Sequence, residues 1–459
     1  MQKPFSLLFL LLFSFLCAKN AYAQNTNEDA LFIKKIYNQI LTDGDCYDWL
    51  HQLSTDYGGR LAGSENADQA VIFTKSIMDT LGFDSVYLQE CTVPHWERGA
   101  TEQVNALYNG QIKQLRATAL GNSPGGKAKA EVLEVFSLEE VEKLGREKIE
   151  GKIVFYNRPM DPTQIRTFNA YGGAVDQRGS GPALASRYGA IATIVRSMTT
   201  KTDSIPHTGV TIFRDDKPTP AAAISTMDAD WLSAQLKKGK VEIAIETHCQ
   251  LLPDVTSHNV IGEIKGSTDP DKIILVGGHL DSWDIGGGAH DDGSGCVHAM
   301  QVLRTMRKLN YQPKHTIRCV LFMNEENGLG GGKAYAEASN QNMEYHMAAL
   351  ESDAGGFTPR GFSVDAENDI FAPRFKKMTQ WLPLLEPYGL SLAKGGSGAD
   401  INPLKSQRGM LIGFRPDSQR YFDFHHTRND TIDAVNQREL ELGAASITSL
   451  IYLIDKYGL

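Results

Sequence analysis

A glycine-rich stretch, GGHLDSWDIGGGAHDDGSG at residues 277–295, constrains this chain more than any other part of the sequence. It follows the apolar, strand-like residues 273–276 and holds one strand-end histidine, four aspartates and seven glycines. Glycine lets a backbone take turns that other residues resist, so the side chains of His279, Asp281 and Asp291 can converge on one point. An ordinary Asp-Gly turn with a surface histidine has a similar pattern. Taken alone, the stretch leaves a metal site and a plain turn open.

Three further segments place metal-ligand types of side chain after apolar runs. The run TIRCVLFM at 316–323 precedes Glu325 and Glu326, a run at 347–351 precedes Asp353, and FDFHHTRNDT contains His425 and His426. Two adjacent carboxylates repel each other unless a positive charge compensates them. In an open α/β sheet, ligand sites lie beyond the carboxyl ends of the strands. We therefore expect the four segments to meet at one divalent metal site.

The order HLD, DDGSG, NEEN, SDAGG and HHTRNDT resembles the co-catalytic zinc exopeptidases of the zinc aminopeptidase and glutamate carboxypeptidase family. The likeness covers most of the chain, and no ligand position departs from the family pattern. It implies an α/β fold with a mixed, largely parallel sheet flanked by helices, and two zinc ions per chain. Carried over residue by residue, it implies the following ligands: His279 and Asp353 for one zinc, Glu326 and His426 for the other, and Asp291 bridging both. The same likeness makes Glu325 the general base and Asp281 a carboxylate that supports a ligand residue without binding the metal itself.

Elementary chemistry agrees with these roles. Zinc accepts imidazole nitrogen and carboxylate oxygen, and a catalytic site keeps one coordination position open for water. Two zinc ions about 3.5 to 4 Å apart can share a water and lower its pKa, so the expected nucleophile is a bridging hydroxide. Glu325 is expected to take the water's proton and pass it to the leaving amine. Asp281, two residues after His279, is expected to accept the other imidazole N–H and fix the tautomer.

Other histidines receive no ligand role. His290 directly precedes Asp291, and neighbouring side chains of an extended chain point apart, so His290 stays unassigned. His298 falls on a predicted helix and is expected to be structural. His425 competes with His426, but the position of His426 before Thr427 and NDT matches the family's ligand position.

The first 23 residues carry Lys3, an apolar run at 5–16 and the pattern Ala21-Tyr22-Ala23, which together predict a cleaved secretory signal. The run is too short for a membrane span, which needs about 20 residues. Leu16 before Cys17 does not fit a lipid-anchor site. The expected location is the periplasm or the outside of the cell.

The rest of the chain divides into a catalytic domain and an insert. Residues 24–117 and 250–459 are predicted to form the catalytic domain, whose alternating strands and helices favour a largely parallel sheet covered on both faces. Residues 118–249 are predicted to form a β-rich insert, because IEGKIVFYNRP, ASRYGAIATIVRS and TPAAAIS resemble the protease-associated domain. The insert either roofs the active site and limits substrate entry, or is a passive addition.

Composition excludes some classes of function. The net charge is −9, which argues against nucleic-acid binding. Beyond the predicted signal lie five cysteines without a CxxC pair, so we expect at least one to be free and expect neither a cysteine-zinc site nor a dense disulfide framework. A homodimer remains an open possibility.

The substrate is less constrained than the chemistry. An exopeptidase must bind a charged terminus, so Asp400 is a candidate for reading an α-amine, and Arg428 or Arg415 for reading a carboxylate. All three could equally be surface charges. The resemblance favours dipeptides or short peptides with a free N-terminus. The alternatives are an aminopeptidase on longer peptides, an amidohydrolase on N-acyl amino acids, and an inactive binding module, although the last predicts lost ligands and all five are present.

Overall fold

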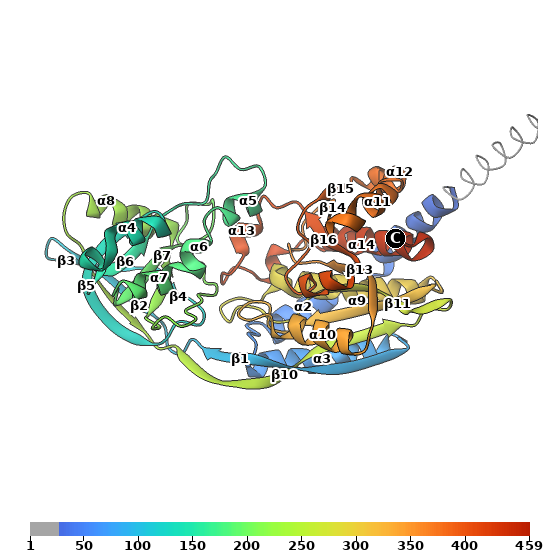
Figure 1. Cartoon of the computed structure of the whole chain (residues 1–459), viewed down its shortest axis with the longest axis horizontal. Coiled ribbons are helices and arrows are strands. Elements are labelled where there is room, and N and C mark those ends of the chain that lie inside the picture. The colour runs from blue at the N-terminus through green and yellow to red at the C-terminus, as the bar shows by residue number, and fades with distance from the viewer. Residues whose placement is uncertain (1–26) are drawn as a thin grey trace, which may run out of the picture.

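The computed structural model describes residues 27–459, which form two lobes that are each built on an eight-stranded sheet (Figure 1). The predicted signal at 1–23 lies outside the described residues. The first sheet has the strand order β1-β10-β12-β11-β13-β16-β14-β15, and the second has β3-β2-β9-β5-β6-β7-β8-β4. The chain therefore leaves the first lobe after β1 and returns to it with β10.

The first sheet is mixed, as predicted. Four of its strand pairs are parallel and three are antiparallel, and the central strands β12, β11, β13 and β16 all run in the same direction. Its strands are β1 (Ser85–Glu97), β10 (Gln250–Ile264), β11 (Asp269–His279), β12 (His315–Phe322), β13 (Tyr345–Glu351), β14 (Pro359–Asp365), β15 (Ser391–Lys394) and β16 (Met410–Pro416). The parallel centre brings the carboxyl ends of three consecutive strands to one edge.

Helices cover both faces of this sheet. On β11, Ile274 and Val276 pack into the core with α9 (Ser294–Lys308) and α14 (Gln437–Tyr457), whereas Leu275 faces α10 (Gly330–Gln341) on the other side. This alternation follows from the two-residue period of a strand. Further helices are α2 (Cys46–Asp56), α3 (Glu65–Thr80), α11 (Asn368–Thr379), α12 (Leu382–Leu385) and α13 (Tyr421–Phe424), and residues 27–43 are also helical.

The second lobe holds the predicted insert. Its strands are β2 (Gln103–Tyr108), β3 (Gln111–Leu115), β4 (Ala117–Ala119), β5 (Gly126–Val135), β6 (Ile153–Tyr156), β7 (Ala192–Arg196), β8 (Ala221–Ile224) and β9 (Glu242–Thr247). Its helices are α4 (Leu138–Ile149), α5 (Thr167–Gly172), α6 (Asp176–Gly179), α7 (Gly181–Arg187) and α8 (Thr226–Leu236). Val154 of β6 packs with α4 and α7, and Phe155 packs with α8, so helices flank this sheet too. The lobe is mixed α/β and not simply β-rich.

The predicted boundary between residues 117 and 118 is too late. Strands β2 and β3 form a hairpin that pairs with β9, so the second sheet already begins at Gln103. Their apolar residues alternate with polar ones; Val104 and Ala106 are buried, whereas Ile112 is 72% exposed. Such a short alternating hairpin lacks the continuous apolar run of a buried parallel strand. For this reason the sequence did not reveal that the hairpin belongs to the second sheet.

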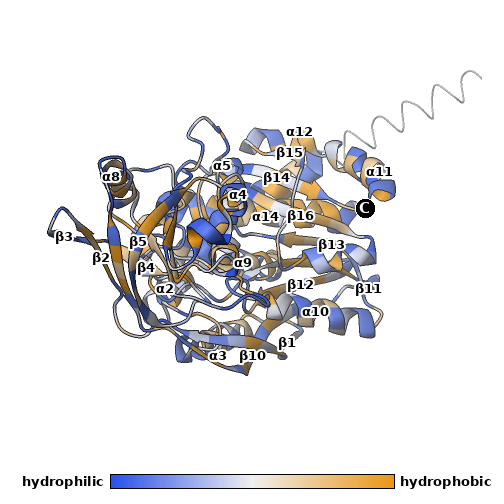
Figure 2. Cartoon of the chain, turned by 60° about the vertical axis from the view of Figure 1, so that its left-hand side comes forward, coloured by the Kyte–Doolittle hydropathy of each residue, from blue (hydrophilic) through white to orange (hydrophobic). Residues whose placement is uncertain are grey.

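Aromatic residues join the lobes. Phe357, Tyr421 and Phe422 of the first lobe pack into an apolar cluster of the second lobe. The hydroxyl of Thr167 in α5 donates to the carbonyl of Ser418 at 2.6 Å. Figure 1 shows α5 and α13 side by side where the lobes meet, and the paired strands β1 and β10 at the edge of the first lobe. Apolar residues run along the strands of both sheets (Figure 2).

The five cysteines of the described residues are all buried and free: Cys46, Cys91, Cys249, Cys296 and Cys319. Between residues 27 and 459, no helix combines the length and the apolar character that crossing a bilayer requires.

Candidate metal centre

The structure brings all five predicted ligands to one edge of the first sheet. His279 is the last residue of β11, Glu326 follows β12, and Asp353 follows β13. Asp291 lies in the one-turn segment Ala289–Gly293 that leads into α9, and His426 follows α13. Because β11, β12 and β13 are parallel neighbours, three of the ligands reach this edge directly from strand ends.

Asp291 lies between the two histidines. Its Oδ1 is 3.2 Å from Nε2 of His279, and its Oδ2 is 3.3 Å from Nε2 of His426. Around this axis, Oδ1 of Asp353 is 3.7 Å from Nε2 of His279, and Oε2 of Glu326 is 3.0 Å from Nε2 of His426. The carboxylate of Asp291 is therefore placed to serve two neighbouring cation positions.

Several of these converging atoms have no hydrogen-bond partner. Nε2 of His279, Oδ2 of Asp291 and Oε1 of Glu326 are buried, and none makes an aligned hydrogen bond although other ligand atoms lie nearby. An unpaired buried polar atom costs free energy, so native proteins rarely leave a cluster of them. Buried imidazole nitrogens and carboxylate oxygens that point at one another are the ligand types of zinc. The donor set therefore fits a metal.

The charges of the site also favour a bound cation. Burial, together with Asp291, raises the pKa of Glu326 to about 7. Burial also raises the pKa of Glu325 well above its ordinary value. For Asp291, burial acts in the same direction, but His279 and His426 outweigh it and hold the pKa well below the ordinary value. The carboxylates thus depend on nearby positive charge to stay ionised.

Asp281 supports the site differently from the prediction. Nδ1 of His279 lies 3.0 Å from the main-chain carbonyl of Asp281 and 3.6 Å from its carboxylate, so the carbonyl accepts the imidazole N–H. The carboxylate instead accepts the main-chain N–H groups of Asn324, Glu325 and Glu326 at 2.7, 3.0 and 3.2 Å. Asp281 therefore fixes the histidine through its main chain and the loop after β12 through its side chain.

Two supporting residues were missed in the sequence. The guanidinium of Arg60 is fully buried and donates to the carbonyls of Gly287 and Gly288 at 2.7 and 2.8 Å, which fixes the loop between His279 and Asp291. The carboxylate of Asp430 accepts the main-chain N–H groups of His290 and Asp291 at 2.7 and 3.1 Å. Arg60 lies in the stretch GGRLAGSEN and Asp430 in NDT, but neither stretch shows which main-chain groups these two residues bind.

Backbone conformation explains one of the glycines, and close approach explains another. Gly288 has a left-handed backbone with φ 59°, which an L residue rarely adopts. A Cβ on Gly295 would lie 1.8 Å from the carbonyl oxygen of Ser352, so only glycine lets α9 begin against the loop after β13.

The neighbouring histidines differ in position. His425 stacks on His426 with ring centroids 3.5 Å apart, and its Nε2 is 3.8 Å from Oδ2 of Asp291, farther than that of His426. His426 has a left-handed backbone, with φ 59°, a strained state that is common at functional sites. His298 contacts the hydroxyl of Ser352 and the carbonyl of Leu440, as a structural residue does.

A cavity of about 470 Å³ covers the centre, and the second lobe supplies part of its wall. The half-buried Glu325 lines it beside the buried Glu326. Arg178 of the second lobe lies 3.4 Å from Nδ1 of His426 through Nη1, and its Nη2 donates to the hydroxyl of Tyr171 at 2.7 Å. Both second-lobe residues line the cavity, so the insert is part of the site's surroundings.

The three predicted substrate-reading residues fall in different places. Asp400 is fully buried, lines none of the three cavities that reach the predicted ligands, and has both carboxylate oxygens unpaired, so a substrate amine cannot contact it directly. Arg428 is exposed and also lines none of them. Arg415 lines a cavity that includes the ligand Asp353. Only Arg415 is therefore placed near the centre.

This fold and this centre define a metallohydrolase: a paired ligand set at the carboxyl edge of an α/β sheet, with an additional glutamate in the cavity above it. Residues 259–450 match the model of peptidase family M28. The chain is 32% identical to carboxypeptidase Q of Mus musculus over 89% of its length and 85% of that relative. It belongs to peptidase family M28 and is a zinc metallo-exopeptidase.

Solved structures agree with this assignment. A peptidase M28 precursor from Shewanella amazonensis is 32% identical, with a TM-score of 0.88 over 94% of this chain and 97% of that one. A zinc aminopeptidase from Bacillus subtilis shares the fold at 20% identity, with a TM-score of 0.64 over 89% and 94%. The resemblance to the co-catalytic zinc exopeptidases is thereby confirmed at the level of the family.

Proposed function

We propose that this protein is an exported exopeptidase that hydrolyses dipeptides or short peptides with a free N-terminus, using two zinc ions. The position of Asp291 between His279 and His426 carries the proposal, because one carboxylate there can bridge two ions. His279 and Asp353 would hold one ion, and Glu326 and His426 the other. Similarity to carboxypeptidase Q over most of the chain supports an exopeptidase of this type.

The residues of the chain divide the chemistry between them. When bound, two zinc ions supply an acidified water and positive charge for the developing oxyanion. Glu325 faces the cavity without being needed as a ligand, so it takes the proton from the water and hands it to the leaving amine. Asp281 fixes the loop that carries Glu325 and, through its carbonyl, the tautomer of His279.

The insert acts as a roof in this proposal. It resembles a protease-associated domain in sequence, and its Tyr171 and Arg178 line the cavity over the ligands. A wall on that side limits the length of peptide that can enter, which favours short substrates. Export is inferred from the sequence pattern at 1–23.

The test is a substrate panel offered to the purified, zinc-loaded protein. Dipeptides of the Ser-Met type, longer peptides with the same first residue, and N-acetyl amino acids are compared by kcat/KM. We expect dipeptides to be cleaved best. If only the N-acetyl amino acids are hydrolysed, the protein is a deacylase and the proposal is wrong. If long peptides are preferred, the protein is an aminopeptidase instead.

A further inference from the structure

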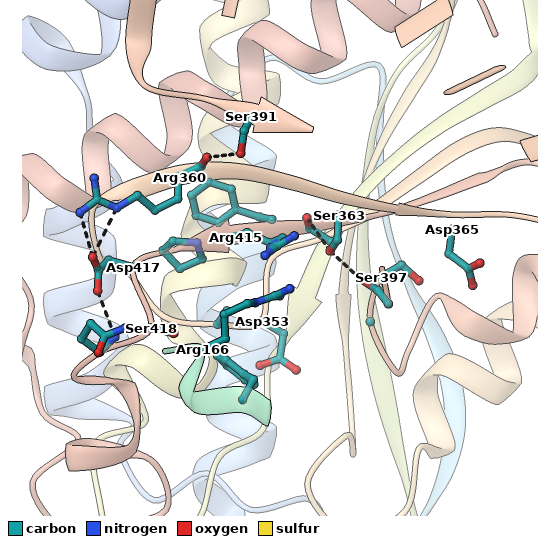
Figure 3. A pocket seen from close by; sticks show the side chains of 18 of the residues that line it. Arg166, Asp353, Arg360, Ser363, Asp365, Ser391, Ser397, Arg415, Asp417 and Ser418 are labelled. Atoms are coloured by element: carbon teal, nitrogen blue, oxygen red, sulfur yellow. Dashed lines mark hydrogen bonds and ion pairs between the residues drawn. The ribbon is translucent and has the colours of Figure 1, made fainter. Parts of the chain in front are cut away.

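A second and larger cavity adjoins the one over the metal centre. It has a volume of about 690 Å³, which is in the range of small-molecule sites. Both cavities are lined by Phe168 and Asp353, so they meet at a predicted metal ligand. Strands β14 and β16 of the first lobe form one wall, and the start of α5 in the second lobe forms another (Figure 3). A substrate held at the metals can therefore extend into this second cavity.

Three arginines and three aspartates line the second cavity, but most of these charges are already paired. Arg360 donates to the carboxylate of Asp417 at 2.8 Å. Asp365 accepts from Nζ of Lys405, also at 2.8 Å. Asp353 belongs to the predicted ligand set. The charges left over are two guanidinium groups, those of Arg166 and Arg415.

Within residues 27–459, neither Arg166 nor Arg415 has an ion-pair or hydrogen-bond partner for its side chain. Figure 3 shows both guanidinium groups turned into the same space. Burial lowers the pKa of Arg415, and the charge of Arg166 lowers it further, as expected for two cations that face one cavity. Two neighbouring cations repel each other, whereas an anion bound between them attracts both and offsets the repulsion. Planar guanidinium groups match the two oxygens of a carboxylate.

Arg166 is held at the cavity although it comes from the second lobe. The residues on either side of it are tied to the loop after β16: Gln419 donates to the carbonyl of Ile165 at 2.6 Å, and Thr167 donates to the carbonyl of Ser418 at 2.6 Å. The backbone of Arg166 is thereby anchored before any ligand arrives. Preorganisation of this kind lowers the cost of binding.

We propose that Arg166 and Arg415 form a subsite that binds a carboxylate of the peptide substrate. The inference rests on the proposed function, because it takes the ligand to be a peptide whose scissile bond lies at the metals. The carboxylate has two chemical sources, the free C-terminus of a dipeptide and an acidic side chain. The two lobes each supply one arginine, so the subsite exists only because the insert closes over the first sheet.

The experiment uses pairs of peptides that differ in one carboxylate. Ser-Met is compared with Ser-Met-NH2 for the C-terminus, Glu-Met-NH2 with Gln-Met-NH2 for the first side chain, and Ser-Glu-NH2 with Ser-Gln-NH2 for the second. The protein variants are Arg415→Gln and Arg166→Gln, with Arg214→Gln as the matched control, since Arg214 is exposed and lines neither cavity. The readouts are kcat/KM, and Kd by calorimetry in a Glu325→Gln background.

We expect the zinc-loaded wild type to prefer the carboxylate member of one pair by about 10 to 100-fold, the usual gain from hydrogen bonds to a charged group. Both variants should reduce that preference to within about threefold, as expected when such bonds are lost, and Arg214→Gln should keep it. The pair that responds identifies the source of the carboxylate. A wild type without preference in any pair, or a preference that survives in Arg415→Gln, overturns the subsite.

The two proposals fail in different ways. If the wild type hydrolyses none of the dipeptides, the proposed function is wrong, and the calorimetric preference and its loss in the arginine variants still decide the subsite. If dipeptides are hydrolysed but the preference does not depend on the arginines, the function stands and the subsite falls.

Discussion

The two lobes have similar architectures, but the polar side chains at the ends of their parallel strands are paired in one lobe and partly unpaired in the other. In the second lobe, β7 ends at Arg196, whose Nη1 donates to the carboxylate of Asp230 at 2.6 Å and to Asn157 at 3.2 Å. In the first lobe, β11 ends at His279, whose Nε2 has no hydrogen-bond partner. One edge thus carries side chains that pair with each other, and the other carries the predicted ligands, several of whose buried atoms are unpaired and fit a bound cation. Strand ends gather polar side chains in both lobes, and pairing decides which edge can do chemistry.

The strongest way to break this comparison is to remove the bridging carboxylate. Asp291→Ala should abolish tight binding of both metal ions and lower kcat/KM by on the order of 10⁴-fold, because metal stabilisation is worth several kcal/mol and each 1.36 kcal/mol is tenfold. Metal content by elemental analysis and dipeptide turnover measure the effect. The matched control is Asp230→Ala, at the strand edge of the second lobe, which should keep its metal and its activity. Full metal content and near-normal turnover in Asp291→Ala would contradict the account.

The next change separates the two adjacent glutamates. Glu325→Gln should keep both metal ions and lower kcat by about 10² to 10⁴-fold, the usual contribution of a general base. Glu326→Gln should lose metal, because Glu326 points at His426 and Glu325 does not. Elemental analysis beside single-substrate kinetics distinguishes them. The assignment fails if Glu325→Gln loses its metal or works at the wild-type rate.

A smaller effect tests whether the second lobe serves the centre. Arg178→Met removes the guanidinium whose Nη1 donates to the carbonyl of Thr208 at 3.3 Å, and that carbonyl lies 3.3 Å from Nδ1 of His426, where it can accept the imidazole N–H. Zinc affinity should therefore fall by about 10 to 100-fold, as for other groups that orient a ligand. Competition with a chelator measures the affinity. Arg187→Met is the control, because Arg187 is an exposed residue of the same lobe that pairs with Asp216. If both variants bind zinc equally well, the insert covers the centre without supporting its ligands.

The smallest effects come from matched helix caps in the two lobes. Ser64 caps α3 and Ser137 caps α4, and the hydroxyl of each accepts a main-chain N–H at 3.2 Å. Replacing either with alanine should lower the free energy of unfolding by about 0.5 to 2 kcal/mol without changing kcat. Urea denaturation followed by circular dichroism measures the change. A loss of activity in Ser137→Ala would show that the second lobe is coupled to catalysis more tightly than its contacts indicate.

The convergence of these side chains was predictable because the predicted ligands follow recognisable strands. His279, Glu326 and Asp353 each come directly after an apolar run, and a parallel sheet brings such positions together whatever the rest of the chain does. The choice of His426 over His425 came only from the family pattern, although the shorter distances to Asp291 and Glu326 agree with it.

The residues that sequence reasoning missed act across long stretches of chain. Arg60 binds carbonyls more than 200 residues away, and Arg166 and Arg178 reach the site from an insert whose sequence contains no catalytic motif. Asp400 has the residue type of an amine reader, but burial that only the fold reveals removes it from the substrate. The hairpin β2–β3 was assigned to the wrong lobe because its partner, β9, follows more than 120 residues later.

The central claim is that the carboxyl edge of the first sheet holds two zinc ions bridged by Asp291. The most direct test is a crystal structure of the protein with anomalous data collected at the zinc absorption edge. We predict two anomalous peaks on opposite sides of Asp291, one contacting His279 and Asp353 and the other contacting Glu326 and His426. A single peak, or zinc bound away from Asp291, would contradict the account.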